Sequence, residues 1–88
     1  MKVEYSKKFL KQLAAVPSDI RSNIESFVFE ELVSASSIYE MGKVEKMKGY
    51  DGVYKVRFGN YRLGLVIENE IIIVKSVMHR REIYKFFP

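Results

Sequence analysis

The second half of this sequence alternates apolar and polar residues so regularly that few folds can accommodate it. Three runs with a period of two span residues 53–58, 61–68 and 71–78, and the dipeptides Gly59-Asn60 and Asn69-Glu70 separate them. Such dipeptides are typical of the two-residue turns that join antiparallel strands. The pattern therefore predicts a three-strand antiparallel meander, in which tight turns fix the residues that lie opposite each other.

The predicted register gathers cations on one face of this meander. A two-residue turn at Gly59-Asn60 places Arg57 opposite Arg62 and Lys55 opposite Gly64, and the next turn places Gly64 opposite Lys75. Like charges that face each other destabilise a sheet by about 0.2–1 kcal/mol per pair, and residues 52–67 contain no acid. We therefore expect an anionic ligand, such as a phosphate, to complete this face. The alternative is that these side chains are ordinary solubilising residues with splayed stems.

The opposite face of the same strands predicts the hydrophobic core. Its apolar residues by alternation are Tyr54, Val56, Phe58, Tyr61, Leu63, Leu65, Ile67, Ile72, Val74 and Met78. Two amphipathic helices are expected to cover this face, one capped by Ser6 and ending near Pro17, the other capped by Ser18 and ending near Val33.

The remaining segments complete an α+β prediction. Residues 2–5 alternate as a short strand does, residues 38–47 fit either a short helix or a loop, and residues 81–87 fit one or two helical turns. We expect a small antiparallel sheet, made of an N-terminal strand and the C-terminal meander. Two N-terminal helices pack on one face, and a short C-terminal helix ends the chain.

Composition limits the classes of protein and site. Residues 1–88 are enough for a single domain with one modest core. The chain has no cysteine and one histidine, so neither a thiolate nor a histidine metal cage is expected, and no cofactor is predicted. Its aliphatic runs are too short to cross a bilayer, which favours a soluble, cytoplasmic protein without a membrane partner.

The positive charge is concentrated in the second half of the chain. Residues 1–42 hold five Lys or Arg and six Asp or Glu, a net charge of −1, whereas residues 43–88 hold ten and five, a net charge of +5. A concentration of this kind favours an anionic partner.

Several motifs, taken in order, resemble the RelE/ParE superfamily of toxins from toxin–antitoxin pairs. They are Tyr5-Ser6 followed by Phe9 and Leu13, Met47-Lys48-Gly49 in place of a Leu-x-Gly, "YKVRFGNYRL" at residues 54–63, and "HRREIY" at residues 79–84. The resemblance covers the whole chain and implies a single RelE-like toxin domain over residues 1–88, with an antiparallel sheet and N-terminal helices on one face.

The RelE branch implies an activity and a set of site residues. Its members are ribosome-dependent endoribonucleases that cut mRNA in the ribosomal A site and inhibit translation. Their basic residues and a tyrosine correspond here to Lys55, Arg57, Arg62, Arg80 and Tyr84. Members of the ParE branch commonly lack part of this set and poison DNA gyrase. A gyrase poison or a non-catalytic nucleic-acid-binding domain is therefore the alternative function.

Metal-independent cleavage of RNA gives each of these residues a role. Lys55 is the expected base, because neighbouring cations disfavour its protonation, while Arg57 and Arg62 are expected to hold the phosphate. Arg80 is expected to assist the leaving group and Tyr84 to stack on or orient a base. Secondary candidates are His79, Arg81 and Lys75.

Apolar residues interrupt the charged face and suggest a protein partner. By alternation Val53, Val66, Ile73 and Val77 lie on it. An antitoxin segment that covers them could bring acidic residues to the cations and displace the C-terminal helix. The alternative is that the C-terminal helix itself covers these residues.

Overall fold

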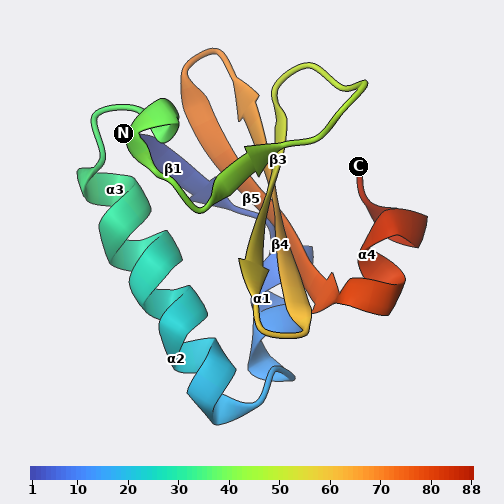
Figure 1. The fold of residues 1–88 in the computed structure, drawn as a ribbon. Coiled ribbons are helices and arrows are strands. Elements are labelled where there is room, and N and C mark those ends of the chain that lie inside the picture. The colour runs from blue at the N-terminus through green and yellow to red at the C-terminus, as the bar shows by residue number, and fades with distance from the viewer.

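The computed structural model describes residues 1–88, and its helices lie on both faces of one five-stranded sheet (Figure 1). In chain order the elements are β1 (Lys2–Tyr5), α1 (Lys7–Ala14), α2 (Ser18–Ser26), the π-helical turn η1 (Phe27–Glu31), α3 (Leu32–Ser34), the 3-10 turn η2 (Ile38–Glu40), β2 (Val44–Lys46), β3 (Val53–Phe58), β4 (Tyr61–Glu68), β5 (Ile71–His79) and α4 (Arg80–Phe86).

The predicted meander forms the centre of the sheet. The strand order is β1-β5-β4-β3-β2, and the predicted strand bounds agree with β3, β4 and β5 to within one residue. At one edge β1 runs parallel to β5, and at the other β2 pairs antiparallel with β3. The α+β prediction is confirmed. The parallel direction of β1 and the extra strand β2 are features that the sequence pattern did not specify.

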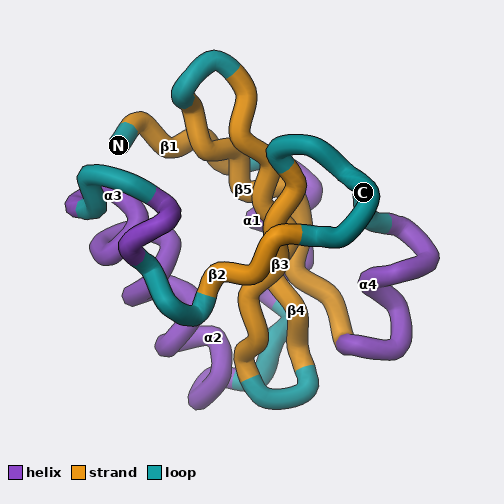
Figure 2. Tube along the Cα trace, turned by 45° about the horizontal axis from the view of Figure 1, so that its top comes forward, coloured by secondary structure: helices purple, strands orange, loops and turns teal.

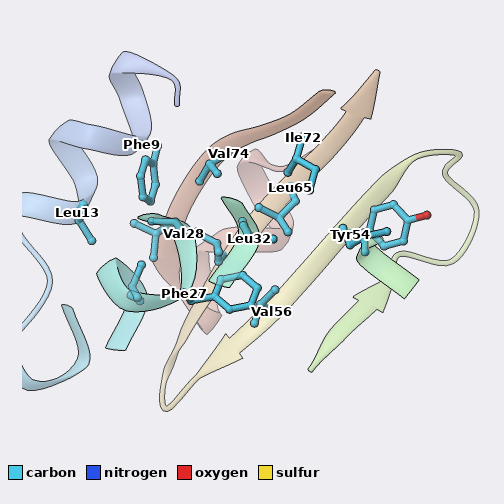
Figure 3. Close-up of a cluster of buried hydrophobic side chains, with 14 of the residues drawn as sticks. Phe9, Leu13, Phe27, Val28, Leu32, Tyr54, Val56, Leu65, Ile72 and Val74 are labelled. Atoms are coloured by element: carbon cyan, nitrogen blue, oxygen red, sulfur yellow. The ribbon is translucent and has the colours of Figure 1, made fainter. Parts of the chain in front are cut away.

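The helix-side core lies between α1, the helical segment from α2 to α3, and the central strands (Figure 3). Phe9 from α1 and Phe27 from η1 are fully buried there against strand residues such as Val56. Each such side chain contributes about 1.5–3 kcal/mol when it is fully buried, so this packing dominates the stability of the fold. Its fully buried strand residues include Val56, Leu63, Leu65, Ile72 and Val74.

Polar contacts fix the helices relative to the strands. The Ser6 hydroxyl accepts from the Phe9 amide at 2.9 Å, as the predicted cap requires, and donates to the Lys75 carbonyl at 2.7 Å. The Tyr5 hydroxyl donates to the Val28 carbonyl in η1 at 2.6 Å, and burial raises the pKa of Tyr5. The second predicted cap, Ser18, was wrong by one position, because Ser18 is the first residue of α2. Pro17 occupies the N-cap position and makes no side-chain capping hydrogen bond.

A β-bulge in β5 changes which residues face the helices. Gly64 lies opposite Ser76, not Lys75, because the register shifts between Gly64 and Leu65 and leaves Lys75 without a partner in β4. One extra residue reverses the alternation that follows it. Val77 is consequently opposite Leu63 in the helix-side core, only 1% exposed, and Met78 is on the other face. The predicted faces of Val77 and Met78 were therefore wrong.

A second, smaller apolar cluster holds α4 on the opposite face of the sheet. It consists of Met47, Val53, Ile83 and Phe87, with Val66 and Met78 packed against it. Figures 1 and 2 both place α4 away from α2 and α3, with the C-terminal end of the chain beside the loop between β2 and β3. The charged face is thus partly covered by the end of the chain. No helix of this protein is both long and apolar enough to traverse a bilayer.

Candidate active site

A small cleft collects the predicted cations on the α4 side of the sheet. Its volume is about 70 Å³, and we call it the cation cleft, lined by Glu45, Lys55, Arg57, Arg62 and Tyr84. Four of the five residues predicted to be catalytic therefore lie together, although they come from three different elements, β3, β4 and α4.

The strand register brings the basic residues together as predicted. Arg57 is paired with Arg62 and Lys55 with Gly64 across β3 and β4. Residues two apart on a strand share a face, so these three side chains project from the same side of the sheet. The short turn between the strands is therefore the local cause of the charge cluster.

Arg62 is oriented by the turn itself. Its guanidinium donates to the carbonyls of Gly59 and Tyr61, at 2.8 and 3.0 Å. A guanidinium has five N–H donors in a fixed planar arrangement. Two contacts to the main chain therefore hold the group in place and leave donors available for an anion.

Lys55 and Tyr84 connect the sheet to α4. The Lys55 Nζ donates to the Tyr84 Oη at 2.8 Å and lies 5.1 Å from the centre of the tyrosine ring. Tyr84 is 57% exposed, so its ring remains accessible to a ligand. The position of α4 thus decides whether Lys55 has a hydroxyl partner.

The cations of the cleft are not neutralised by ion pairs. The only salt bridge in the structure joins Lys43 to Glu31, at 3.5 Å, and no carboxylate oxygen lies within 4 Å of the charged nitrogens of Lys55, Arg57 or Arg62. Positive charges held close together without ion-paired acids raise the local potential and attract anions. A phosphate group has the charge and the acceptor oxygens that such a cleft requires.

Glu45 is a site residue that the sequence reasoning missed. No sequence pattern singles out Glu45, but β2 places it directly opposite Lys55, in the wall of the cation cleft. The strand that positions it is three residues long, too short for a convincing alternation. The nearest signal in the sequence is the short Val44-Glu45-Lys46 run within the segment left open between helix and loop.

The other predicted site residues lie outside the cleft. Arg80 and Arg81 are exposed at the start of α4, and the Arg80 amide donates to the Asn60 carbonyl at 2.7 Å. Lys75 is exposed in the β5 bulge. His79 caps α4: its Nδ1 accepts from the Arg81 amide at 3.2 Å, and its ring packs edge-on against Tyr61 at 5.7 Å. This geometry gives His79 a structural role at the start of α4.

Comparison with known proteins decides the family. Residues 3–84 match the family model described as ParE toxin of type II toxin–antitoxin system, parDE. The chain belongs to the RelE/ParE superfamily of toxins. It is 39% identical to Toxin RelE3 of Methanocaldococcus jannaschii over the full length of both chains, and 33% identical to the putative toxin RelE1 of that organism, covering 94% of this chain and 93% of the relative.

A solved structure supports the fold of the toxin over nearly its whole length. The crystal structure of a RelB-RelE antitoxin–toxin complex from Methanococcus jannaschii contains a chain that is 36% identical to this one. The TM-score is 0.81, and the match covers 97% of this chain and 99% of that chain. The arrangement of sheet and helices described above is therefore that of a known toxin fold.

Two of the four predicted antitoxin contacts, Val53 and Val66, lie beneath α4 in this toxin. Val53, Val66 and Ile73 form one cross-strand row, in which Val53 is buried in the α4-side cluster and Val66 packs against it. This is the alternative in which the C-terminal helix covers the apolar residues. Val77 is removed from the set, because it lies in the core on the other face.

Phe87 fills the space that Gly64 leaves between the cations. A Cβ built at Gly64 would lie 2.8 Å from three carbons of the Phe87 ring, closer than real Cβ contacts come. Phe87 is 5% exposed, and its amide donates to the Ile83 carbonyl at 2.8 Å. The space left by the missing side chain in β4 is therefore filled by the residue that follows α4.

We expect Gly64→Ala to loosen α4 without damaging the helix-side core. The added methyl displaces the Phe87 ring from its position against residue 64, which should lower the free energy of unfolding by about 1–3 kcal/mol. Chemical unfolding should show this loss, and amide hydrogen exchange over residues 80–88 should accelerate.

Gly42→Ala is the matched control, because a Cβ at Gly42 meets nothing within 4 Å. Its unfolding free energy should stay within about 0.5 kcal/mol of the unmodified toxin. Equal stability and equal amide hydrogen exchange in the two variants would contradict the proposed packing of Phe87 against Gly64.

Proposed function

We propose that this toxin is an mRNA endoribonuclease that cuts RNA on the ribosome and so inhibits translation. The observation that carries the proposal is the convergence of Lys55, Arg57 and Arg62 on one cleft, without an ion-paired acid and beside an exposed tyrosine. The resemblance to RelE toxins supplies the ribosome as the place of action.

The proposed reaction uses the 2′-hydroxyl of the RNA as nucleophile. Its oxygen attacks the adjacent phosphorus while a base removes its proton, the bond from phosphorus to the 5′-oxygen breaks, and an acid protonates that leaving oxygen. The products carry a 2′,3′-cyclic phosphate and a 5′-hydroxyl. The reaction therefore requires a proton acceptor, cations for the developing charge and a proton donor.

Arg57 and Arg62 suit the stabilisation of the pentacoordinate phosphate. They face each other across the two strands, and Arg62 is already held by two carbonyls. Donors that are oriented before the reaction stabilise the transition state without further reorganisation. We assign these two residues to the phosphate oxygens.

Lys55 is our first candidate for the base, and Glu45 is the second. Lys55 lines the cleft beside Arg57 and Arg62 and can take up a proton as the free amine, whereas Glu45, directly opposite Lys55, can take one up as the carboxylate. Tyr84 accepts from Lys55 and keeps its own hydroxyl hydrogen, so it can donate to the leaving oxygen. Arg80 and Arg81 lie outside the cleft, and we assign them to flanking phosphates.

A gyrase poison of the ParE kind is the second candidate function. The match to the family model described as a ParE toxin favours it. Primer extension on mRNA from cells that express the toxin distinguishes the two. Cuts inside translated codons support the endoribonuclease, whereas intact mRNA with an induced DNA-damage response supports the poison.

We further propose that a cognate antitoxin inhibits the toxin by taking the place of α4. The similar chain of known structure is in complex with a RelB antitoxin. Removal of α4 would expose Val53 and Val66, which continue across the strands to Ile73, to an apolar partner segment. It would also take Tyr84 away from Lys55, and acidic antitoxin residues could then neutralise the cations.

Arg62→Ala should relieve growth arrest and slow cleavage by about 10²–10³-fold, because it removes a preorganised donor to the phosphate. Primer extension and the yield of 5′-hydroxyl ends measure the effect. Arg21→Ala is the matched control, since Arg21 lies on α2 and makes only a 3.4 Å bond to the Ala14 carbonyl. Undiminished arrest by folded Arg62→Ala protein would refute the role.

Two substitutions distinguish the two candidate bases: Lys55→Arg conserves the charge, and Glu45→Gln conserves the shape of the side chain. If Lys55 is the base, Lys55→Arg should lower single-turnover cleavage on programmed ribosomes by about 10²–10⁴-fold, because arginine stays protonated. Glu45→Gln should then cleave at a similar rate and bind RNA at least as tightly. The reverse pattern would assign the proton transfer to Glu45.

Antitoxin binding should release the C-terminal segment. Hydrogen exchange at the Phe87 amide, which bonds to Ile83 in the free toxin, should become faster in a complex co-purified from the native operon. Slower exchange over residues 80–88, or a complex that still cleaves mRNA, would show that the antitoxin acts elsewhere.

A further inference from the structure

We propose that Gln12, a residue of α1 on the helix side of the sheet, is a positioning residue for RNA cleavage. Its side chain bonds to the part of β5 that contains and follows the bulge, residues 75–79, which we call the bulge segment. The bulge segment leads directly into α4, which carries Tyr84. The inference deepens the endoribonuclease function proposed above and rests on it.

The bulge segment lies at an edge of the sheet where no neighbouring strand covers it. β1 ends at Tyr5, whose partner is Val74, so β5 continues past the end of its neighbour. In a longer ladder the next strand would bond the main-chain N–H and C=O groups that point outward from this edge. Partly buried main-chain groups without a strand partner need another partner. The bulge segment therefore depends on side chains for its outer hydrogen bonds.

Two side chains from the beginning of the chain supply these hydrogen bonds. The Ser6 hydroxyl donates to the Lys75 carbonyl at 2.7 Å, over a separation of 69 residues. The Gln12 Oε1 accepts from the Val77 amide at 2.9 Å, over a separation of 65 residues. Ser76 lies between the two bonded residues. The main chain of the bulge is thus held on either side of Ser76 from outside the strand.

The bulge decides which side chain lies opposite Gly64. Without the extra residue, regular pairing would place Lys75 opposite Gly64, where the Phe87 ring packs. The bulge places Ser76 there instead and leaves Lys75 exposed. Ser76 is 2% exposed and its hydroxyl has no hydrogen-bond partner, but a buried ammonium would cost far more. The bulge is therefore what allows the end of the chain to pack on this part of the sheet.

Two different forces hold the bulge segment. Burial of Val77 in the helix-side core favours the bulged register over the regular one. Burial has no preferred direction, whereas the hydrogen bond to Gln12 fixes the direction and the distance of the Val77 amide. Hydrophobic packing thus selects the register, and Gln12 fixes the position of the strand within it.

The position of the bulge segment reaches the cation cleft through α4. Met78 packs against the apolar cluster beneath α4, and α4 begins two residues later. Tyr84, on that helix, accepts from Lys55 at 2.8 Å. A displacement of about 1 Å at a reacting group can slow a reaction about 10²-fold. Gln12 does not line the cleft, so it acts on the reaction through Tyr84.

The test is a double-mutant cycle of Gln12→Leu and Tyr84→Phe, measured as single-turnover cleavage on saturating programmed ribosomes. Leucine has about the size of glutamine but no acceptor for the Val77 amide. Gln12→Leu should slow cleavage by about 10-fold or more and change ribosome binding by less than about 2-fold, because it displaces a reacting group and removes no contact to RNA. In Tyr84→Phe toxin the same substitution should cost less than about 2-fold, since the hydroxyl that it displaces is already absent.

Two further measurements separate positioning from a general loss of stability. Hydrogen exchange at the Val77 and Phe87 amides should become about 5- to 150-fold faster in Gln12→Leu, because an unpaired and partly buried donor favours local opening. Gln12→Glu keeps an acceptor oxygen at the same place. It should therefore restore both slow exchange and the cleavage rate of the unmodified toxin.

Tyr5→Phe is the matched control, because it removes another side-chain bond of the helix side, the 2.6 Å bond to the Val28 carbonyl, which joins β1 to η1. It should lower the stability of the fold to a similar extent and leave the cleavage rate within about 2-fold. Three results would overturn the positioning role and leave the endoribonuclease function intact: undiminished cleavage by Gln12→Leu, equal losses in Gln12→Leu and Tyr5→Phe, or additive losses in the cycle. No cleavage by the unmodified toxin would overturn both proposals.

Discussion

The contact between Phe87 and Gly64 is the constraint on which the functional face of this toxin depends. Gly64 is the only position in the cationic rows of β3 and β4 without a side chain, and the Phe87 ring occupies that space. With Ile83 it closes the apolar cluster that holds α4 against the sheet. Because α4 carries Tyr84, this packing also completes the cation cleft.

The paired cations of β3 and β4 lower the stability of the sheet but create a strong positive potential in the cation cleft. Arg57 and Arg62 are paired across the strands, and no carboxylate forms a salt bridge with either. The helix-side core contributes most of the stability, since its largest side chains come from α1, α2, η1 and α3 and are fully buried. The opposite face can therefore hold charges that repel one another, because the fold does not rely on them.

The strand pairing could be predicted from the sequence wherever tight turns or long alternating runs determined the geometry. The turn at Gly59-Asn60 predicted the pairing of Arg57 with Arg62, and the structure has that pairing. The bulge at Lys75 escaped prediction because Val77 and Met78 are both apolar, so a shift by one residue leaves the pattern of hydrophobicity almost unchanged. Glu45 was missed for a related reason: β2 is so short that only its pairing with β3 defines it.

If RNA and the antitoxin bind as proposed, the docking of α4 couples two ligands that need not touch each other. RNA in the cation cleft would contact Tyr84 and therefore favour the docked helix, whereas an antitoxin on Val53 and Val66 would require the undocked one. Each ligand then lowers the affinity of the toxin for the other by the same factor, as linkage demands. The free energy that holds Ile83 and Phe87 in place sets how much of its own binding energy the antitoxin must spend on inhibition. A modest apolar cluster is suited to this task, because a much tighter one would leave the toxin beyond the control of its partner.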